Sequence, residues 1–434
     1  MNKQYKIVVA GTGYVGLVTG VCLAELGHFV TCVDISVEKI ELMKKGVSPI
    51  YEPGLQELMV KNKSRLNFTT DYRSAYKDAD VIFIAVGTPE QEDGSANLNY
   101  VRIVSKEIAD SINNDCVIVV KSTVPIGTND EVEKFIKDNL TADVNVSIAS
   151  NPEFLSQGSA VKDTLHAKRI VIGVENKQAE KVLRDVYSGF DQPFVITNRR
   201  SAEMIKYASN DYLALKISYI NEIANICELV GANIEEVTRG MSYDPRIGKE
   251  FLKSGIGYGG ACFPKDTKAL YNQASSEFGY ELQTVKASID VNARQKTKLF
   301  FEAKKHFGSF DGINVAILGL TFKPATDDLR EAPSVDNINM LLKNGAKIKA
   351  YDPVGNDNAK KIFGDTITYK NDIELTIKDA DVVFIMTEWQ EIREFDINKY
   401  KELMKTPVVY DGRNCYEVAK MKAAGIDYIS IGRR

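Results

Sequence analysis

The feature that most limits the fold is a glycine-rich turn directly after a short β-branched run near the N-terminus. Ile7-Val8-Val9-Ala10 is followed by Gly11-Thr12-Gly13-Tyr14-Val15-Gly16 and then by a stretch of helical character. Glycines at this spacing allow a tight strand-to-helix turn and let a pyrophosphate approach the helix N-terminus. Asp34 ends the next β-branched run, about twenty residues on, where a carboxylate hydrogen-bonds a ribose. The pattern predicts a βαβ unit that binds a dinucleotide.

The charge of Asp34 distinguishes between two dinucleotides. A carboxylate there would repel the 2′-phosphate of NADP, so NAD is the expected cofactor. Lys39 lies near the same ribose in this arrangement and softens the preference. A glycine turn without a ligand is the alternative, but strand, glycines, helix and acid coincide here.

The composition is that of a globular protein with several domains. The chain has 434 residues, 44% of them hydrophobic and 26% charged, and it is too long for one ordinary core. A net charge of −4 argues against a nucleic-acid partner. No run approaches the roughly 18 apolar residues of a membrane span, and the N-terminus leads directly into the first predicted strand. We therefore expect neither a membrane segment nor a signal peptide.

The cysteines divide into two groups. All but Cys262 lie in apparent core segments, without the Cys-x-x-Cys spacing of a metal site. We expect no metal and no disulfide framework, which favours a reducing cytoplasm. The cysteines of this larger group are Cys22, Cys32, Cys116, Cys227 and Cys415.

Cys262 lies in the run Gly257-Tyr258-Gly259-Gly260-Ala261-Cys262-Phe263-Pro264-Lys265-Asp266. The glycines permit positive φ and a close approach to a ligand, and Pro264 suits the first position of a helix. The thiol is therefore expected at the positive end of a helix with Lys265 nearby, and both influences favour the nucleophilic thiolate. A buried, inert cysteine is the ordinary alternative.

β-branched runs alternate with helical patterns in both the first and the last part of the chain. This alternation predicts an α/β fold with two Rossmann-like domains and parallel sheets. Residues 77–84 are nearly repeated at 378–385, although the second half lacks a G-x-G-x-x-G turn. The expected strands are 7–10, 30–33, 81–86, 117–120, 146–149, 170–173, 315–319, 348–352, 382–386 and 408–410.

A helical segment separates the two strand series. Residues 201–230 contain no proline or internal glycine, which predicts an unusually long helix, and helical patterns continue to about His306. We expect this long central helix to join the two halves and to belong to a helical dimerisation domain. The expected domains are 1–195, which binds NAD; 196–306, which is helical and carries the Cys262 turn; and 307–434, which is Rossmann-like and binds the second ligand.

Several motifs are spread over the chain. They are Gly11–Gly16, Ser122-Thr123-Val124-Pro125-Ile126-Gly127-Thr128, Asn151-Pro152-Glu153-Phe154-Leu155, Lys206-Tyr207-Ala208-Ser209-Asn210 and the Cys262 run. Taken together they resemble the UDP-glucose/GDP-mannose dehydrogenase family over nearly the whole chain. Arg246–Lys253 and residues 326–334 resemble its UDP-glucose 6-dehydrogenase branch in particular. The resemblance implies that C6 of UDP-glucose is oxidised twice, with two NAD, to UDP-glucuronate, and that 307–434 is a UDP-sugar-binding domain.

The resemblance implies how one carbon is oxidised twice. Cys262 would attack the intermediate aldehyde to give a thiohemiacetal, whose oxidation leaves a thioester for water to hydrolyse. Lys206 would stabilise the oxyanion and shuttle protons. Asn210 lies four residues later and would face the same side of the helix. Without this context the two side chains would form a plain polar face.

Three further residues complete the implied catalytic set. Glu153 would serve thioester hydrolysis as a base or water-orienting group. Thr123 would join its hydrogen-bonded network, and Asp266 would belong to the water and proton network near the thiol. As alternatives, Thr123 shapes a turn before Pro125 and Asp266 caps a helix.

The resemblance also implies which residues contact the ligands. Gln157 departs from the glutamate of many relatives, which affects cofactor affinity more than chemistry. The implied cofactor contacts are Gly11, Thr12, Gly13, Tyr14, Val15, Gly16, Asp34, Lys39, Thr88, Thr123, Gln157, Lys265 and Arg330. The implied substrate contacts are Glu153, Phe154, Leu155, Lys206, Asn210, Arg246, Phe251, Leu252, Lys253, Tyr258, Gly259, Lys323 and Arg413.

The resemblance further implies a homodimer in which Arg246 reaches the neighbouring active site, and a flexible loop over the substrate at 251–260. Two other functions remain open. One is a dehydrogenase of UDP-N-acetylhexosamine or GDP-mannose. The other is a catalytically inactive NAD-binding regulator, since a fold alone does not specify activity.

Overall fold

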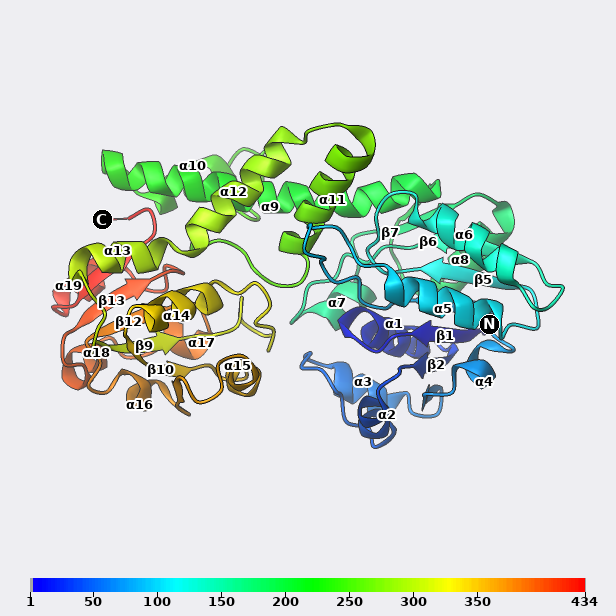
Figure 1. The fold of residues 1–434 in the computed structure, drawn as a ribbon, viewed down its shortest axis with the longest axis horizontal. Helices are drawn as coiled ribbons and strands as arrows, with labels where there is room; N and C mark the ends of the chain where they lie inside the picture. Colours follow the sequence, from blue (N-terminus) through cyan, green and yellow to red (C-terminus); the bar gives the residue numbers. More distant parts are fainter. Residues whose placement is uncertain (1–2, 434) are drawn as a thin grey trace. The chain divides into compact units, whose positions relative to one another are not determined.

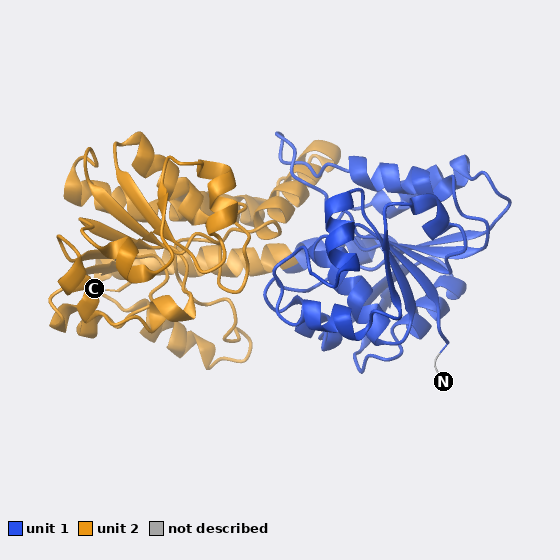
Figure 2. Ribbon diagram, turned by 90° about the horizontal axis from the view of Figure 1, so that it is seen from below, with its two compact units in different colours: residues 1–209 blue, residues 210–434 orange. Residues whose placement is uncertain are grey.

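The computed structural model describes residues 3–433. The chain divides into two compact units, Met1–Ser209 and Asn210–Arg434, which Figure 2 colours separately. The boundary falls within one long helix, α9 (Arg199–Val230), so this helix contributes to both units.

An eight-stranded sheet forms the centre of the first unit (Figure 1). Its order is β3-β2-β1-β4-β5-β6-β7-β8. Neighbouring strands are parallel except β6 and β7, whose antiparallel pairing departs from the all-parallel sheet that we expected. The strands are β1 Lys6–Ala10, β2 Phe29–Val33, β3 Leu66–Thr69, β4 Val81–Ile84, β5 Cys116–Val120, β6 Val146–Ser150, β7 Ile170–Val174 and β8 Phe194–Thr197.

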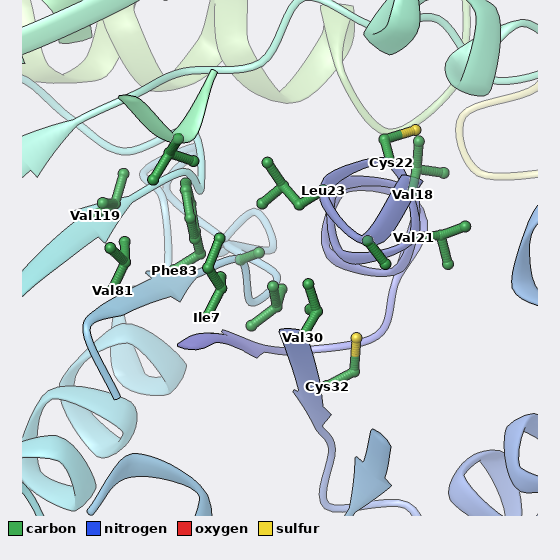
Figure 3. Close-up of a cluster of buried hydrophobic side chains, with 14 of the residues drawn as sticks. Ile7, Val18, Val21, Cys22, Leu23, Val30, Cys32, Val81, Phe83 and Val119 are labelled. Atoms are coloured by element: carbon green, nitrogen blue, oxygen red, sulfur yellow. The ribbon is translucent and has the colours of Figure 1, made fainter. Parts of the chain in front are cut away.

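Helices cover both faces of this sheet because alternate strand residues point to opposite sides. Val9 and Phe83 belong to a cluster with residues of α1, α3 and α8, whereas Val8 and Ile82 pack with α5 and α6. Figure 3 shows labelled side chains of the first cluster from the strands and from α1. The helices are α1 Tyr14–Glu25, α2 Val37–Lys44, α3 Leu55–Lys61, α4 Tyr72–Tyr76, α5 Asn99–Ala109, α6 Thr128–Asn139, α7 Ala160–Leu165 and α8 Lys177–Val186.

The second unit is built around a six-stranded parallel sheet of order β11-β10-β9-β12-β13-β14. Its strands also alternate between two clusters: Val315 and Ile317 pack with α13, α14 and α15, whereas Ala316 and Leu318 pack with α16 and α18. The strands are β9 Asn314–Leu318, β10 Lys347–Tyr351, β11 Thr368–Tyr369, β12 Val382–Ile385, β13 Val408–Asp411 and β14 Asp427–Ser430. The helices that follow α9 are α10 Ile234–Ser242, α11 Phe263–Phe278, α12 Gln283–Lys296, α13 Lys298–Phe307, α14 Pro333–Lys343, α15 Asn356–Phe363, α16 Ile373–Ile377, α17 Gln390–Arg393, α18 Asn398–Leu403 and α19 Val418–Ala423.

The repeated sequence has a shared structural role in the two units. The order β3-β2-β1-β4-β5-β6 corresponds to β11-β10-β9-β12-β13-β14. Asp80 and Asp381, at matching positions of the repeat, each accept a hydrogen bond from the first strand's amide, Lys6 N at 2.8 Å and Asn314 N at 2.9 Å. The expected pair of Rossmann-like halves is therefore confirmed.

The long helix is confirmed as well, since the predicted 201–230 appears as α9. The helical character that we expected to continue to about His306 is interrupted by an irregular segment between α10 and α11. Among residues 3–433, no helix is both long enough and apolar enough to cross a membrane. The same residues contain no cluster of metal-ligating side chains.

Candidate active site

The turn between β1 and α1 has two kinds of glycine. A Cβ on Gly11, whose φ is +97°, would lie 2.7 Å from the carbonyl oxygen of Ala85, and a Cβ on Gly16 would lie 2.0 Å from that of Gly11. These two glycines are required by the turn itself. A Cβ on Gly13 would meet nothing within 4 Å, and α1 begins there without a side-chain cap or an acidic residue in its first turn. This open helix end suits an anionic pyrophosphate.

Asp34 follows β2 and is tied to the same turn. Its Oδ2 accepts hydrogen bonds from the Thr12 amide at 2.9 Å and the Thr12 hydroxyl at 2.5 Å, and Oδ1 accepts from the Ser36 amide at 2.9 Å. Burial opposes ionisation, but these bonds and the charge of Lys39 hold the pKa of Asp34 below its ordinary value. The carboxylate is thus positioned and ionised as the expected ribose ligand would require.

A buried ion pair lies beyond the carboxyl end of β6, within the first unit. Lys206 Nζ, from α9, lies 2.8 Å from Glu153 Oε1, and only 4% and 6% of the two side chains are exposed. The second oxygen, Glu153 Oε2, accepts the Leu155 amide at 2.7 Å. Lys206 Nζ also lies 5.5 Å from the centre of the Phe154 ring. The structure therefore brings four of the predicted residues into one cluster.

Predicted cofactor contacts on neighbouring loops are also linked. The Thr88 hydroxyl donates to the carbonyl oxygen of Thr123 at 2.8 Å, which joins the loops after β4 and β5. Gln157 lies in a loop held by Glu52, whose carboxylate accepts the Gly158 amide at 2.8 Å. Parallel strands deliver these loops to one edge of the sheet, where α/β proteins bind ligands.

Lys121 is a residue that the sequence analysis did not select. It follows β5 directly and is only 7% exposed. Its Nζ lies 3.0 Å from Asn151 Oδ1 and 3.3 Å from the Asn151 carbonyl oxygen. Its place in the sequence, one residue before the Ser122–Thr128 motif, was the available signal. Its burial depends on segments distant in the chain.

In the second unit, Cys262 is exposed and forms the N-cap of α11, as the glycine and proline pattern predicted. Pro264 occupies the second helical position rather than the first that we expected, because α11 already begins at Phe263. Asp266 is 1% exposed, and its amide donates to the Cys262 carbonyl oxygen at 2.8 Å. Its Oδ2 accepts from Asn210 Nδ2 at 2.6 Å and its Oδ1 pairs with Lys265. Asp266 thus connects the thiol-bearing helix to α9.

The glycines before Cys262 pack closely against the loop after β9. A Cβ on Gly259 would lie 2.3 Å from the carbonyl oxygen of Glu331, and one on Gly260 would lie 2.8 Å from the Phe322 ring. The Gly260 amide donates to the Arg330 carbonyl oxygen at 2.8 Å. The absence of a side chain at Gly259 and Gly260 therefore lets the thiol turn lie against this loop.

The segment 251–260 is mostly buried and anchored rather than spread loosely over the surface. Phe251 has a φ of +62°, and Leu252 is buried. The Tyr258 amide donates to Asn292 Oδ1 at 2.8 Å. Arg413 donates to the carbonyl oxygens of Gly257 at 3.1 Å, Phe322 at 3.2 Å and Met386 at 2.9 Å. Arg413 therefore ties this segment to the carboxyl ends of the second sheet.

The other predicted cations have neighbours within the second unit. Lys253 Nζ lies 3.5 Å from Glu388 Oε1. Arg246 pairs with Asp244 at 2.6 Å while its side chain is 88% exposed. Arg330 pairs with Asp328 at 2.6 Å. Lys323 Nζ lies 5.6 Å from the Phe322 ring centre, in the same loop after β9.

Asp211 is a second residue that the sequence analysis missed. It is buried beside Asn210, and neither carboxyl oxygen has a hydrogen-bond partner among residues 3–433. Burial, and then the charge of Asp266, raise the pKa of Asp211 to about 8. A carboxyl group that is neutral below this pH therefore lies near the Asn210–Asp266 pair.

Comparison with known proteins agrees with this arrangement. Three models of the UDP-glucose/GDP-mannose dehydrogenase family match the chain: the NAD binding domain at residues 5–191, the central domain at 200–294 and the UDP binding domain at 316–418. The chain is 51% identical over 430 residues to UDP-glucose 6-dehydrogenase YwqF of Bacillus subtilis (strain 168), with 99% of this chain and 98% of that protein covered.

Solved structures extend the similarity to three dimensions. A UDP-glucose dehydrogenase from Pyrobaculum islandicum aligns with a TM-score of 0.92 and 36% identity, covering 99% of this chain and 97% of that one. A UDP-D-ManNAc dehydrogenase from Pyrococcus horikoshii aligns with a TM-score of 0.86 and 25% identity, covering 98% and 99%. The chain therefore belongs to the UDP-glucose/GDP-mannose dehydrogenase family, and its first unit carries that family's NAD binding domain.

Proposed function

We propose that this protein is an NAD-dependent UDP-glucose 6-dehydrogenase that oxidises C6 of UDP-glucose twice to give UDP-glucuronate. The observation that carries the proposal is that one NAD-type turn accompanies an exposed thiol at the N-terminus of α11. A two-electron alcohol dehydrogenase has no use for that thiol. The 51% identity to a UDP-glucose 6-dehydrogenase supports this choice of sugar.

In the first oxidation, the C6 hydroxyl loses its proton to Lys206 Nζ as the C6 hydride leaves. NAD held at the Gly11–Gly16 turn supplies the hydride acceptor. Glu153, at 2.8 Å, takes this proton from Lys206 and passes it to water, which returns Lys206 to its unprotonated form before the second oxidation. The product is an aldehyde, which has no hydroxyl to deprotonate.

In the second oxidation, the Cys262 thiolate attacks the aldehyde carbon and the new oxyanion takes a proton, which gives a thiohemiacetal. A second loss of hydride, with the hydroxyl proton again taken by Lys206, would leave a thioester on Cys262. Water, oriented by Glu153 and Thr123, then releases the uronate and the thiol. The Asn210 amide would donate to the oxyanion, and Asp266, which accepts from Asn210 at 2.6 Å, would accept from water near the thiol.

The second unit is proposed to hold the UDP-sugar. The family's UDP binding domain covers residues 316–418, which include Lys323 and Arg413. Cations near a diphosphate would neutralise its charge, and the anchored 251–260 segment would line the sugar. We propose that the domains are 1–195 for NAD, 196–306 for the helical segment with Cys262, and 307–434 for the UDP-sugar. A working thiol at Cys262 needs a reducing compartment, which supports the cytoplasm.

The homodimer is proposed from an unpartnered face of α9. Tyr212, Tyr219 and Ile226 recur every seven residues on this helix and are 61%, 51% and 48% exposed. Leu229 and Val230 continue the apolar surface at its end. A stripe at this spacing suits packing against a second copy of the same helix. Arg246, exposed beyond α10, would then reach the neighbouring site.

The deciding experiment measures NADH formed per sugar across a panel of nucleotide sugars. We expect two NADH per UDP-glucose, with UDP-glucuronate as product. One NADH with released aldehyde would contradict the proposal, and preference for UDP-N-acetylhexosamine or GDP-mannose would reassign the substrate. NAD binding without turnover of any sugar would favour the inactive regulator.

A Cys262→Ser variant tests the role of Cys262 as the nucleophile. We expect it to bind NAD normally but to stall, because a serine ester hydrolyses more slowly than a thioester. Wild-type turnover by this variant would rule out Cys262 as the nucleophile.

A further inference from the structure

Lys121 is a buried lysine that contacts Asn151, two residues before Glu153 of the Lys206–Glu153 pair. Its Nζ donates to two oxygens of Asn151, at 3.0 and 3.3 Å. Asn151 is already held by other partners, because Tyr187 donates to Oδ1 at 2.5 Å and Nδ2 donates to the Val171 carbonyl oxygen at 2.7 Å. Asn151 therefore does not need an ammonium group to stay in place.

Burial disfavours the charge of Lys121 and lowers its pKa to about 8. Attraction to Glu153 opposes this decrease, and the smaller repulsion from Lys206 adds to it. Cys22 of α1 interacts electrostatically with Lys121, and Tyr187 after α8 donates to the same Asn151 Oδ1. Burial raises the pKa of both groups. Among residues 3–433, the hydrogen-bond acceptors of Lys121 are neutral, so burial of its ammonium group lowers the stability of the folded protein.

The buried charge of Lys121 has a function if it changes the protonation of Lys206. Glu153, 2.8 Å from Lys206, favours the protonated ammonium form of Lys206. A base must instead be unprotonated to accept a proton from the substrate. Electrostatic repulsion is mutual, so the charge of Lys121 opposes protonation of Lys206 just as Lys206 opposes that of Lys121.

We propose that Lys121 acts through Lys206, as a buried positive charge that favours the unprotonated form of Lys206 and so prepares it to take the C6 hydroxyl proton. The inference rests on the proposed function. The transferred proton goes from the hydroxyl to Lys206 Nζ, and the proton of Lys121 is not transferred. Lys121 is thus a positioning residue for charge rather than a group that touches the substrate.

The first test is the pH dependence of kcat with UDP-glucose for wild type and Lys121→Met. Without the repelling charge, Lys206 keeps its proton to higher pH, so we expect the acid limb of the profile to move up by about one pH unit. Lys162→Met, an exposed lysine change on α7, is the matched control and should leave the limb in place. An unmoved limb in Lys121→Met would overturn the proposal.

The second test is thermal unfolding of the same variants, which needs no turnover. The folded pKa of Lys121, about 8, lies below the lysine value of about 10.4 in the unfolded chain. Folding therefore carries the full penalty below pH 8, and the penalty fades as the pH rises toward about 10. We expect Lys121→Met to melt at higher temperature than wild type at pH 7, with the difference shrinking above pH 8.

The two tests separate the possible failures. A purely structural Lys121 would give a lower melting temperature at pH 7 in Lys121→Met and the same small loss in Tyr187→Phe, which weakens the hold on Asn151. That result would overturn the inference while leaving the proposed function intact. If the wild type oxidises no nucleotide sugar, the proposed function fails and this inference falls with it, even where the melting data show a buried titrating charge.

Discussion

Individual side chains in this protein take their properties from neighbours far away in the sequence. Asp266 and Cys262 lie on one helical turn, so their association is local. Lys121 and Asp211 adjoin predicted residues in the sequence, but their burial comes from Asn151 in one case and from packing around α9 in the other. Their altered charge states are therefore properties of the folded chain.

Asp211 gives a prediction about stability. Its pKa is about 3.8 in the unfolded chain and about 8 when folded. The folded state keeps a proton that the unfolded state releases, so stability falls as the pH rises from about 4 to about 8. We expect Asp211→Asn to remove this loss, on the order of 5 kcal/mol at pH 8.

Thermal unfolding at several pH values checks the prediction. Asp211→Asn should melt roughly 10–20 °C above wild type at pH 8 and should match it near pH 4. Asp290→Asn, a change to a half-exposed aspartate on α12, should behave like wild type apart from losing its surface ion pair with Lys286. A pH-independent difference for Asp211→Asn would show that its charge is not the cause.

At the scale of elements, α9 has three tasks along 32 residues. Its first part brings Lys206 to Glu153, and its middle brings Asn210 to Asp266. Its outer face carries the apolar residues that remain exposed. A single uninterrupted helix keeps these residues in register, because each position follows from a rise of about 1.5 Å per residue.

The exposed face predicts an effect on assembly. Tyr219→Glu places a charge at the centre of the apolar stripe on both copies of the helix. We expect the dissociation constant of the dimer to rise on the order of 100-fold, measured by sedimentation or light scattering across protein concentrations. Tyr100→Glu, a change to a similarly exposed tyrosine on α5, is the control. An unchanged assembly in Tyr219→Glu would rule out this face as the interface.

At the scale of the whole molecule, the two units have separate cores. No hydrophobic cluster contains residues of both units among the described residues. The chain has one tryptophan, Trp389, which is buried in the second unit and donates to Asp352 at 3.1 Å. Asp352 is the counterpart of Asp34 in the first unit and also accepts from the amides of Leu320 and Thr321. In the second unit the Trp389 indole therefore donates to the carboxylate whose counterpart, Asp34, lies near the proposed ribose site.

This arrangement makes Trp389 a reporter of one unit. In urea unfolding, we expect NAD at about 100 times its Kd to stabilise the first unit by about 2.7 kcal/mol. The circular dichroism transition should move accordingly, whereas the Trp389 fluorescence transition should stay in place. Equal shifts of both signals would show that the two units unfold as one.

Features that depend on neighbouring residues could be predicted from the sequence: the glycine turn of β1 and α1, the alternating strands, the length of α9 and the position of Cys262 at a helix start. These follow from short-range backbone sterics, periodicity and capping. Other features became visible only in the folded chain: the antiparallel pairing of β6 and β7, the packing of Gly259 and Gly260 against protein, and the burial of Lys121 and Asp211. These features require contacts between distant segments, and burial then changes the cost of a charge in a way that no local pattern records.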